Sequence, residues 1–301
     1  MKVASPASPR RFRSLEKRDN HVGYAFLAPA ILVLLVIVAY PVLYSFTMSF
    51  HRWVPIDLDR HFVGLKNYVR VITDSRFALS IRNTFIYALV GACFKVIIGL
   101  GLALMMNREF KGRGVARVLL MLPWVIPVTA SVTGWNWMFD GMYGIINVIL
   151  HRLGLIDEYV NFLGQKGTAL ACVLMVGIWM GYPQMMMMLL AGLQAIPKDI
   201  YEAAVVDGSS PVRTFFQITI PSLAGVLKMA IILSIIWTFN SFNVIWLMTR
   251  GGSGTHTMNT LAYEFSFVNM RYDYGAAMSV LILLMLAIFL AIYTKIQKQE
   301  N

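Results

Sequence analysis

The chain has 301 residues, of which 58% are hydrophobic and only 14% are charged, and its mean hydropathy is +0.64. A soluble domain has about one-quarter charged residues, so the composition excludes an ordinary soluble protein. The net charge of +11 would suit nucleic-acid binding, but the dense basic clusters lie in short segments between apolar runs. That pattern is typical of a membrane protein and argues against a nucleic-acid partner.

Six apolar runs are long enough to cross a bilayer, which takes roughly 20 helical residues. They cover about 24–46, 84–106, 118–139, 168–193, 222–248 and 277–297. The first run is too long for a signal-peptide core and is not followed by a small-residue cleavage site, so we expect a retained helix. The sequence therefore predicts an all-α integral membrane protein with six transmembrane helices, in contact with membrane lipid.

Lysine and arginine are distributed unevenly over the segments between these runs. Fourteen lie in the tail 1–23, the loop 107–117, the segment 195–213 and the C-terminus, against ten in 47–83, 140–167 and 249–276. The positive-inside rule places the first set in the cytoplasm. We therefore expect both termini and the polar segment 194–221 to be cytoplasmic.

The chain divides by composition into four regions. We expect a disordered, basic cytoplasmic tail at 1–22, a first helix with an external segment at 23–79, a transmembrane domain at 80–294 and a short cytoplasmic tail at 295–301. In the external segments we expect a membrane-interface piece at 47–83, a short re-entrant or interfacial turn at 140–167 and a flexible loop at 249–276.

Motifs for catalysis are missing from the sequence. It has no Gly-rich phosphate loop ending in Gly-Lys-Ser/Thr, no metal-ligand spacing among its five histidines and no Gly-x-Ser-x-Gly elbow. Cys93 and Cys172 lie within apolar runs and are interpreted as small buried hydrophobes. We expect no enzymatic activity, no cofactor and no metal site in this chain.

The polar segment 195–221 predicts two short helices broken at Asp207-Gly208. Pro197 suits a first helical position, Gly208 can adopt positive φ, and Ser209 or Ser210 would cap the second helix. Ala203 and Ala204 would give a flat patch, and Phe215 and Phe216 two large anchors. An amphipathic helix on the lipid surface would need a basic polar face. Because acidic residues outnumber basic ones here, a protein partner is favoured.

This segment resembles the EAA signature of permease subunits in binding-protein-dependent ABC importers. The resemblance rests on Glu202-Ala203-Ala204, then Gly208, then Ile218-x-Ile220-Pro221, with Ile220 where the family usually has leucine. Other stretches, such as Asn243–Gly252, resemble the sugar-importing branch, which is maltose- and glycerol-3-phosphate-permease-like. The resemblance implies the type I importer fold, with a cytoplasmic coupling helix that docks on an ATPase subunit. The predicted coupling residues are Glu202, Ala203, Ala204, Asp207, Gly208, Phe215, Ile218 and Pro221.

The same resemblance implies the partners and the location. We expect a heterodimer with a second homologous permease, two ATP-binding subunits that hydrolyse the ATP, and a periplasmic or extracellular solute-binding protein. The expected location is the bacterial inner (plasma) membrane. The solute would be a sugar or a related polyhydroxy compound, such as an oligosaccharide, a polyol or a glycerol phosphate; the sequence does not identify which.

Polar residues at helical spacing predict a solute route. On the fifth run they form one stripe, and the resemblance places sugar contacts at the matching positions; two further residues lie on the fourth run around Tyr182-Pro183. The predicted route residues are Gly181, Gln184, Ser234, Trp237, Thr238 and Ser241. Packing between helices is the alternative for all six, because small and hydroxylated residues favour tight membrane interfaces.

Lys95 lies near the middle of the second run, where a charge costs roughly 2.5–3.5 kcal/mol on insertion scales. We expect its side chain to face the protein interior or water. Two other classes remain open: a secondary transporter or channel, which would need charged ion-coupling groups in the membrane, and a membrane-anchored scaffold.

Overall fold

The computed structural model describes residues 26–55 and 60–299, with side chains described through residue 295. The predicted disordered tail 1–22 and the last two residues of the 295–301 tail lie outside this part of the chain. The described residues are mostly helical, and their one β pairing is an isolated bridge between His51 and Phe62. The prediction of an all-α protein is confirmed.

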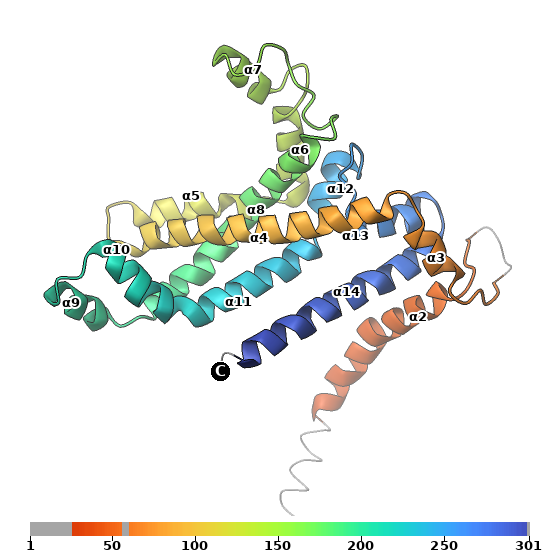
Figure 1. Cartoon of the computed structure of the whole chain (residues 1–301), viewed down its shortest axis with the longest axis horizontal. Coiled ribbons are helices and arrows are strands. Elements are labelled where there is room, and N and C mark those ends of the chain that lie inside the picture. Colours follow the sequence, from red (N-terminus) through yellow and green to blue (C-terminus); the bar gives the residue numbers. More distant parts are fainter. Residues whose placement is uncertain (1–25, 56–59, 300–301) are drawn as a thin grey trace, which may run out of the picture.

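Four long helices form the body of the molecule. They are α4 (Phe77–Asn107), α8 (Ala169–Gln194), α11 (Ile220–Phe239) and α14 (Tyr272–Gln299). Helix α4 packs against both α8 and α11, while α14 packs against α2 (Tyr40–Ser49), as Figure 1 shows. Fully buried Met185, Met186 and Leu189 of α8 fill the seam with α4 and α11. The predicted runs 84–106, 168–193 and 277–297 are therefore confirmed as helices.

The first predicted run is also helical, from Phe26 to Ser49, and includes one π-helical stretch, η1 (Leu35–Ala39). The large side chains between Phe26 and Phe46 are almost all exposed. In a membrane protein such a surface faces lipid or another subunit, because exposing this much apolar surface to water is unfavourable.

The third predicted run, 118–139, is not one straight helix. It consists of α5 (Arg113–Val125) and α6 (Val128–Met138), which meet at 90°. The bend follows from Pro127, because the proline ring clashes with a helical conformation of the preceding residue, and Ile126 is extended with ψ of 133°. A bend of this kind cannot be predicted from apolar composition alone. The six predicted spans correspond to five continuous helices and one bent pair among the described residues.

The fifth predicted run, 222–248, is displaced. The helix begins at Pro211, passes through α10 (Pro211–Thr214) and the π-helical stretch η2 (Phe215–Thr219) into α11, and ends at Phe239. After a break at 240–242, α12 (Asn243–Thr249) continues as a separate short helix. The Asn240 side chain bonds back to the Ile236 carbonyl at 2.9 Å within its own helix.

The segments between the long helices are more ordered than predicted. The 47–83 segment contains α3 (Lys66–Ile72), and 140–167 contains α7 (Ile145–Arg152), which projects with α6 from the side of the bundle in Figure 1. The predicted flexible loop 249–276 is wrong. It includes α13 (Met258–Tyr263) and π-helical η3 (Glu264–Val268), and Thr255, His256 and Thr257 are buried.

Hydrogen bonds and ion pairs explain this order. The Asn83 amide donates to the carbonyls of Gly254 and His256, at 2.7 and 2.9 Å. Arg76 pairs with Asp74 at 3.0 Å and with Glu264, and the other Glu264 oxygen lies 3.2 Å from His256 Nε2. The hydrogen bond from Arg76 lowers the pKa of Asp74. These groups tie the start of α4 to the loop before α13.

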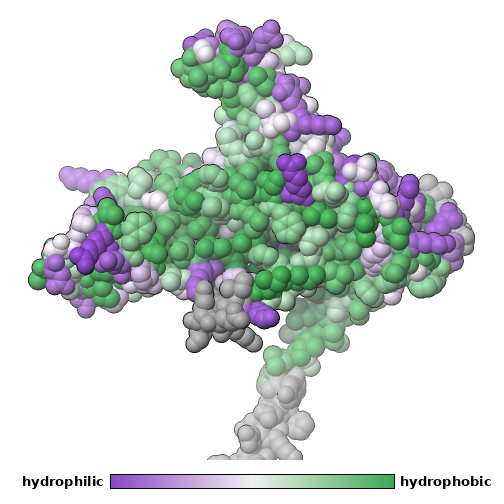
Figure 2. Space-filling view, in the orientation of Figure 1, coloured by the Kyte–Doolittle hydropathy of each residue, from purple (hydrophilic) through white to green (hydrophobic). Residues whose placement is uncertain are grey.

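The surface carries a broad apolar belt with hydrophilic ends, as Figure 2 shows. The described helices include five long and apolar enough to span a membrane, or six with the bent pair. Cys172 is buried as predicted, but Cys93 is exposed on α4 within the belt. The apolar belt and the number of long apolar helices together indicate a multi-pass membrane architecture.

Candidate coupling site

The polar segment after α8 folds as two helices joined by a tight turn at one end of the bundle (Figure 1). Pro197 caps α9 (Lys198–Val206) rather than beginning it, since its ψ is 137°. Gly208 has φ of +71°, as predicted, and the amides of Gly208 and Ser209 bond to the carbonyls of Val205 and Ala204. Glycine at this αL position ends the helix without strain.

The next helix begins at Ser210, which settles the two alternatives for its cap. The Ser210 hydroxyl accepts a bond from the Arg213 amide at 3.3 Å, and Pro211 follows at the first helical position. The second helix is not a separate unit, because it continues through η2 into α11. The end of the polar segment is thus continuous with a long apolar helix, Pro211–Phe239.

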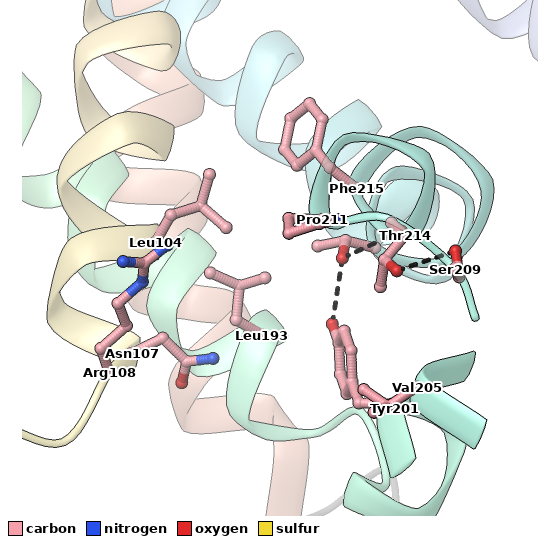
Figure 3. Close-up of a pocket in the computed structure, with 11 residues that line it drawn as sticks. Leu104, Asn107, Arg108, Leu193, Tyr201, Val205, Ser209, Pro211, Thr214 and Phe215 are labelled. Atoms are coloured by element: carbon pink, nitrogen blue, oxygen red, sulfur yellow. Dashed lines mark hydrogen bonds between the residues drawn. The ribbon is translucent and has the colours of Figure 1, made fainter. Parts of the chain in front are cut away.

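Two side-chain contacts fasten α9 and the turn after it to this long helix. The Tyr201 hydroxyl lies 3.3 Å from the Thr219 hydroxyl, and the Ser209 and Thr214 hydroxyls are 3.1 Å apart. Between α9, η2 and the end of α4 lies a cavity of about 470 Å³, shown in Figure 3. Phe215 and Leu104 are among the side chains that line it. The polar segment is thus attached to the long helix by these two hydroxyl contacts, and a cavity remains beside them.

The two predicted patches face in different directions. Ala204 is 5% exposed and packs inward, whereas Ala203 and Glu202 are exposed. Likewise Phe215 turns toward the cavity, while Phe216 is 65% exposed. Of the predicted alanine patch and phenylalanine anchors, Ala203 and Phe216 are exposed, while Ala204 and Phe215 are turned inward.

Sequence reasoning missed the most exposed apolar side chains of the segment. Val206 is 87% exposed, and Val205 and Val212 are also exposed on either side of the Gly208 turn. Their position beside Asp207-Gly208 could have signalled them, because a β-branched residue before a helix-ending glycine has no core to join. Ile218 is partly buried and Pro221 is exposed near the start of α11.

The predicted solute-route residues are split between packed and open positions. Ser234 and Thr238 are 1% and 3% exposed, within the packing of α11 against the bundle. Trp237 is 46% exposed, and Gly181, Gln184 and Ser241 are partly exposed. Ser234 and Thr238 are therefore in packed positions, and a Cβ at Gly181 would lie 2.6 Å from Lys95 Cε, so Trp237, Gln184 and Ser241 are the route residues with accessible side chains.

Fold and site together define a multi-pass membrane protein with a polar two-helix segment at one end of its bundle. A family model described as "Binding-protein-dependent transport system inner membrane component" matches residues 95–299. The chain belongs to this family and is an inner-membrane, multi-pass permease component.

Curated relatives match along nearly the whole chain. It is 37% identical to the trehalose/maltose transport system permease protein MalF of Thermococcus litoralis, over 94% of this chain and 95% of the relative. It is 33% identical to the sulfoquinovosyl glycerol transport system permease protein SmoG of Agrobacterium fabrum, over 100% and 98%. The Escherichia coli permease protein YcjO is 32% identical over 92% and 93%.

A solved structure has the same fold. A chain of a bacterial ABC transporter involved in import of the acidic polysaccharide alginate matches with a TM-score of 0.83 and 21% identity, covering 96% of this chain and 99% of that one. The importer transmembrane fold expected from the sequence is confirmed by this match.

Proposed function

We propose that this chain is a permease subunit of an ATP-driven ABC importer for a sugar or a related polyhydroxy solute. The names of the relatives support the solute class, since they are permeases for trehalose/maltose and sulfoquinovosyl glycerol. The alginate importer structure was also solved with a solute-bound periplasmic protein. Such a solute-binding protein would deliver the solute to this subunit.

The observation that carries the proposal is the polar segment around Gly208. It presents exposed Val206 at the end of α9, and exposed Val212 and Phe216 on the helix continuous with α11, at a hydrophilic end of the molecule. Apolar side chains in such a place are typical of a protein interface. Because the sequence has no phosphate loop, we assign ATP hydrolysis to two separate ATP-binding subunits, and the segment 195–221 to coupling.

The remaining partner would be a second homologous permease, which would complete the solute route. The exposed Trp237 and the partly exposed Gln184 and Ser241 lack a covering surface of their own chain. In a heterodimer these side chains would line a cavity that opens to each side in turn. We place both termini and the coupling segment in the cytoplasm, on the distribution of basic residues.

The experiment substitutes Gly208 by alanine and by tryptophan in the complete importer. Gly208 is exposed and a Cβ there meets no atom within 4 Å, so neither substitution brings its Cβ into a clash within the isolated permease. Both variants have the backbone strain of the +71° φ, about 1–2 kcal/mol. Only the bulky tryptophan would obstruct an ATPase subunit, so we expect it to lose uptake and ATPase co-purification.

The alanine variant is the matched control, and Glu202→Lys tests the same face by charge. If Gly208→Trp supports normal uptake and normal co-purification, the coupling role is refuted. Uptake that continues without ATP but follows an ion gradient would instead support a secondary transporter.

A further inference from the structure

Lys95 connects three helices in the middle of the bundle. It lies on α4, and its ammonium donates a hydrogen bond to the Thr238 hydroxyl of α11 at 2.9 Å. Its aliphatic stem crosses Gly181 of α8, where a Cβ would lie 2.6 Å from Lys95 Cε. The absence of a side chain at Gly181 therefore leaves room for this lysine. Two predicted solute-route residues, Gly181 and Thr238, are thus in contact with Lys95.

The charge of Lys95 is not matched within the surrounding helices. Helices α4, α8 and α11 contain no aspartate or glutamate over their whole described lengths. Among the described residues, the one recorded hydrogen-bond partner of the ammonium is the neutral Thr238 hydroxyl. An ammonium has three donors, so two stay available for another acceptor. An unpaired cation at this depth is costly, and an anion beside it would offset part of that cost.

Two of the accessible route residues are close in sequence to the groups that Lys95 contacts. Trp237 precedes Thr238 on α11 and is 46% exposed, while Gln184 is one turn beyond Gly181 on α8 and is partly exposed. Lys95 itself is only partly buried, so part of its side chain is accessible. A solute stacked on Trp237 would therefore come within range of a fixed positive charge.

We infer that Lys95 is a specificity-determining residue of the solute route and that it selects solutes carrying a carboxylate, sulfonate or phosphate group. The ammonium keeps its bond to Thr238 and uses its free donors for the anionic oxygens, while Trp237 contacts the sugar ring. This inference rests on the proposed import function. It narrows the solute from polyhydroxy compounds in general to acidic ones.

The test measures the electrostatic field in the route directly. In the complete importer in membrane vesicles, Cys93 and Cys172 are replaced by alanine and Trp237→Cys is added as a reporter. The modification rate of this cysteine is compared for the anionic reagent sulfonatoethyl methanethiosulfonate and its cationic trimethylammonium counterpart. We expect Lys95→Met to lower the anionic-to-cationic rate ratio on the order of tenfold, since a nearby unit charge acts oppositely on the two reagents. Lys95→Arg should preserve the ratio.

Lys228→Met is the matched control. It removes the same charge, but from α11 rather than from α4, where Lys95 lies. It should leave the ratio unchanged. A ratio that does not respond to Lys95→Met overturns the inference and leaves the import function standing. A reporter that neither reagent modifies in any nucleotide state shows that no water reaches Trp237, and this overturns the proposed route itself.

Protection by solute tests the selection. For this test the reporter cysteine is placed at Gln184 (Gln184→Cys), which is partly exposed, so that Trp237 is kept. Digalacturonate, an acidic disaccharide, should slow modification of this reporter more than the neutral disaccharide maltose does. Lys95→Met should abolish that difference. Equal protection by the two sugars, or none by either, would overturn the assignment of an acidic solute.

Discussion

His256 is enclosed by charged groups at the end of the bundle opposite the coupling segment. Burial lowers the pKa of His256, and this outweighs the opposing attraction of the Glu264 carboxylate; Arg76 lowers it further and Asp74 raises it. A histidine whose folded pKa is lowered stays neutral in the folded protein where the unfolded chain already takes up a proton. Its contribution to stability is therefore complete above the unfolded value of about 6.5 and is lost as the pH falls.

We accordingly predict that wild-type protein loses thermal stability between about pH 7 and about pH 5, and that His256→Gln reduces this loss. The measurement is the unfolding temperature in detergent across that pH range. The same substitution at His151 on α7, away from the ion cluster, should retain the wild-type pH dependence. Equal slopes for the wild type and His256→Gln would refute the assignment.

Gly251 and Gly254 form a natural pair for separating backbone strain from a side-chain clash. Their φ angles are +78° and +76°, so alanine is strained at both positions by about 1–2 kcal/mol. A Cβ at 251 would overlap the His256 ring, whereas at 254 its nearest neighbour is Lys166 Cγ at 3.6 Å. We predict that Gly251→Ala lowers the unfolding temperature clearly more than Gly254→Ala. Similar losses would mean that His256 moves aside at no cost.

At the scale of the element, the two alanines of the coupling segment differ in role. Ala204 is buried and Ala203 is exposed on the same short helix. We predict that Ala204→Leu destabilises the permease by about 1–3 kcal/mol through overpacking. Ala203→Leu should leave its stability unchanged but weaken ATPase co-purification. Melting and pull-down of the two variants check this; a pull-down loss confined to Ala204→Leu would contradict it.

Helix α9 also shows what sequence could and could not predict. The Gly208 turn and the serine cap follow from local chemistry, so they were predictable from a few neighbouring residues. The inward direction of Ala204 and Phe215 depends on where α4 and η2 lie, which is tertiary information. The same reason applies to Ser234 and Thr238: their polar stripe was visible, but the helix that covers it was not. Lys95 was noticed as costly, yet its contact with Thr238, 143 residues away, has no sequence signal.

At the scale of the whole molecule, the long helices were predictable because lipid demands continuous apolar length. Their interruptions were not: Pro127 bends one predicted span, and the break at 240–242 splits another, although both segments remain apolar. The structured ends, such as the buried Thr255–Thr257 loop, were also missed. Gly and Ser there suggested flexibility, while bonds from Asn83 on α4 hold the loop in place.

The proposed orientation gives a prediction for the whole molecule. Loop residue Lys111 and the tip residue Tyr143 lie in segments assigned to opposite sides of the membrane. Both residues are exposed. We predict that Tyr143→Cys reacts with an impermeant maleimide once the outer barrier is opened, while Lys111→Cys reacts only after the inner membrane is permeabilised. The reverse pattern would invert the assigned topology.

The 90° bend between α5 and α6 has a consequence for how the chain enters the membrane. Each piece is shorter than a bilayer crossing, and the segment 113–138 qualifies as a span only when both are taken together. We therefore expect the insertion machinery to read the two halves together as one apolar stretch of sufficient length. In the folded bundle the same two halves pack against different helices, α5 against α8 and α6 against α12. Insertion of this segment would thus depend on both halves, although the fold treats them as separate helices.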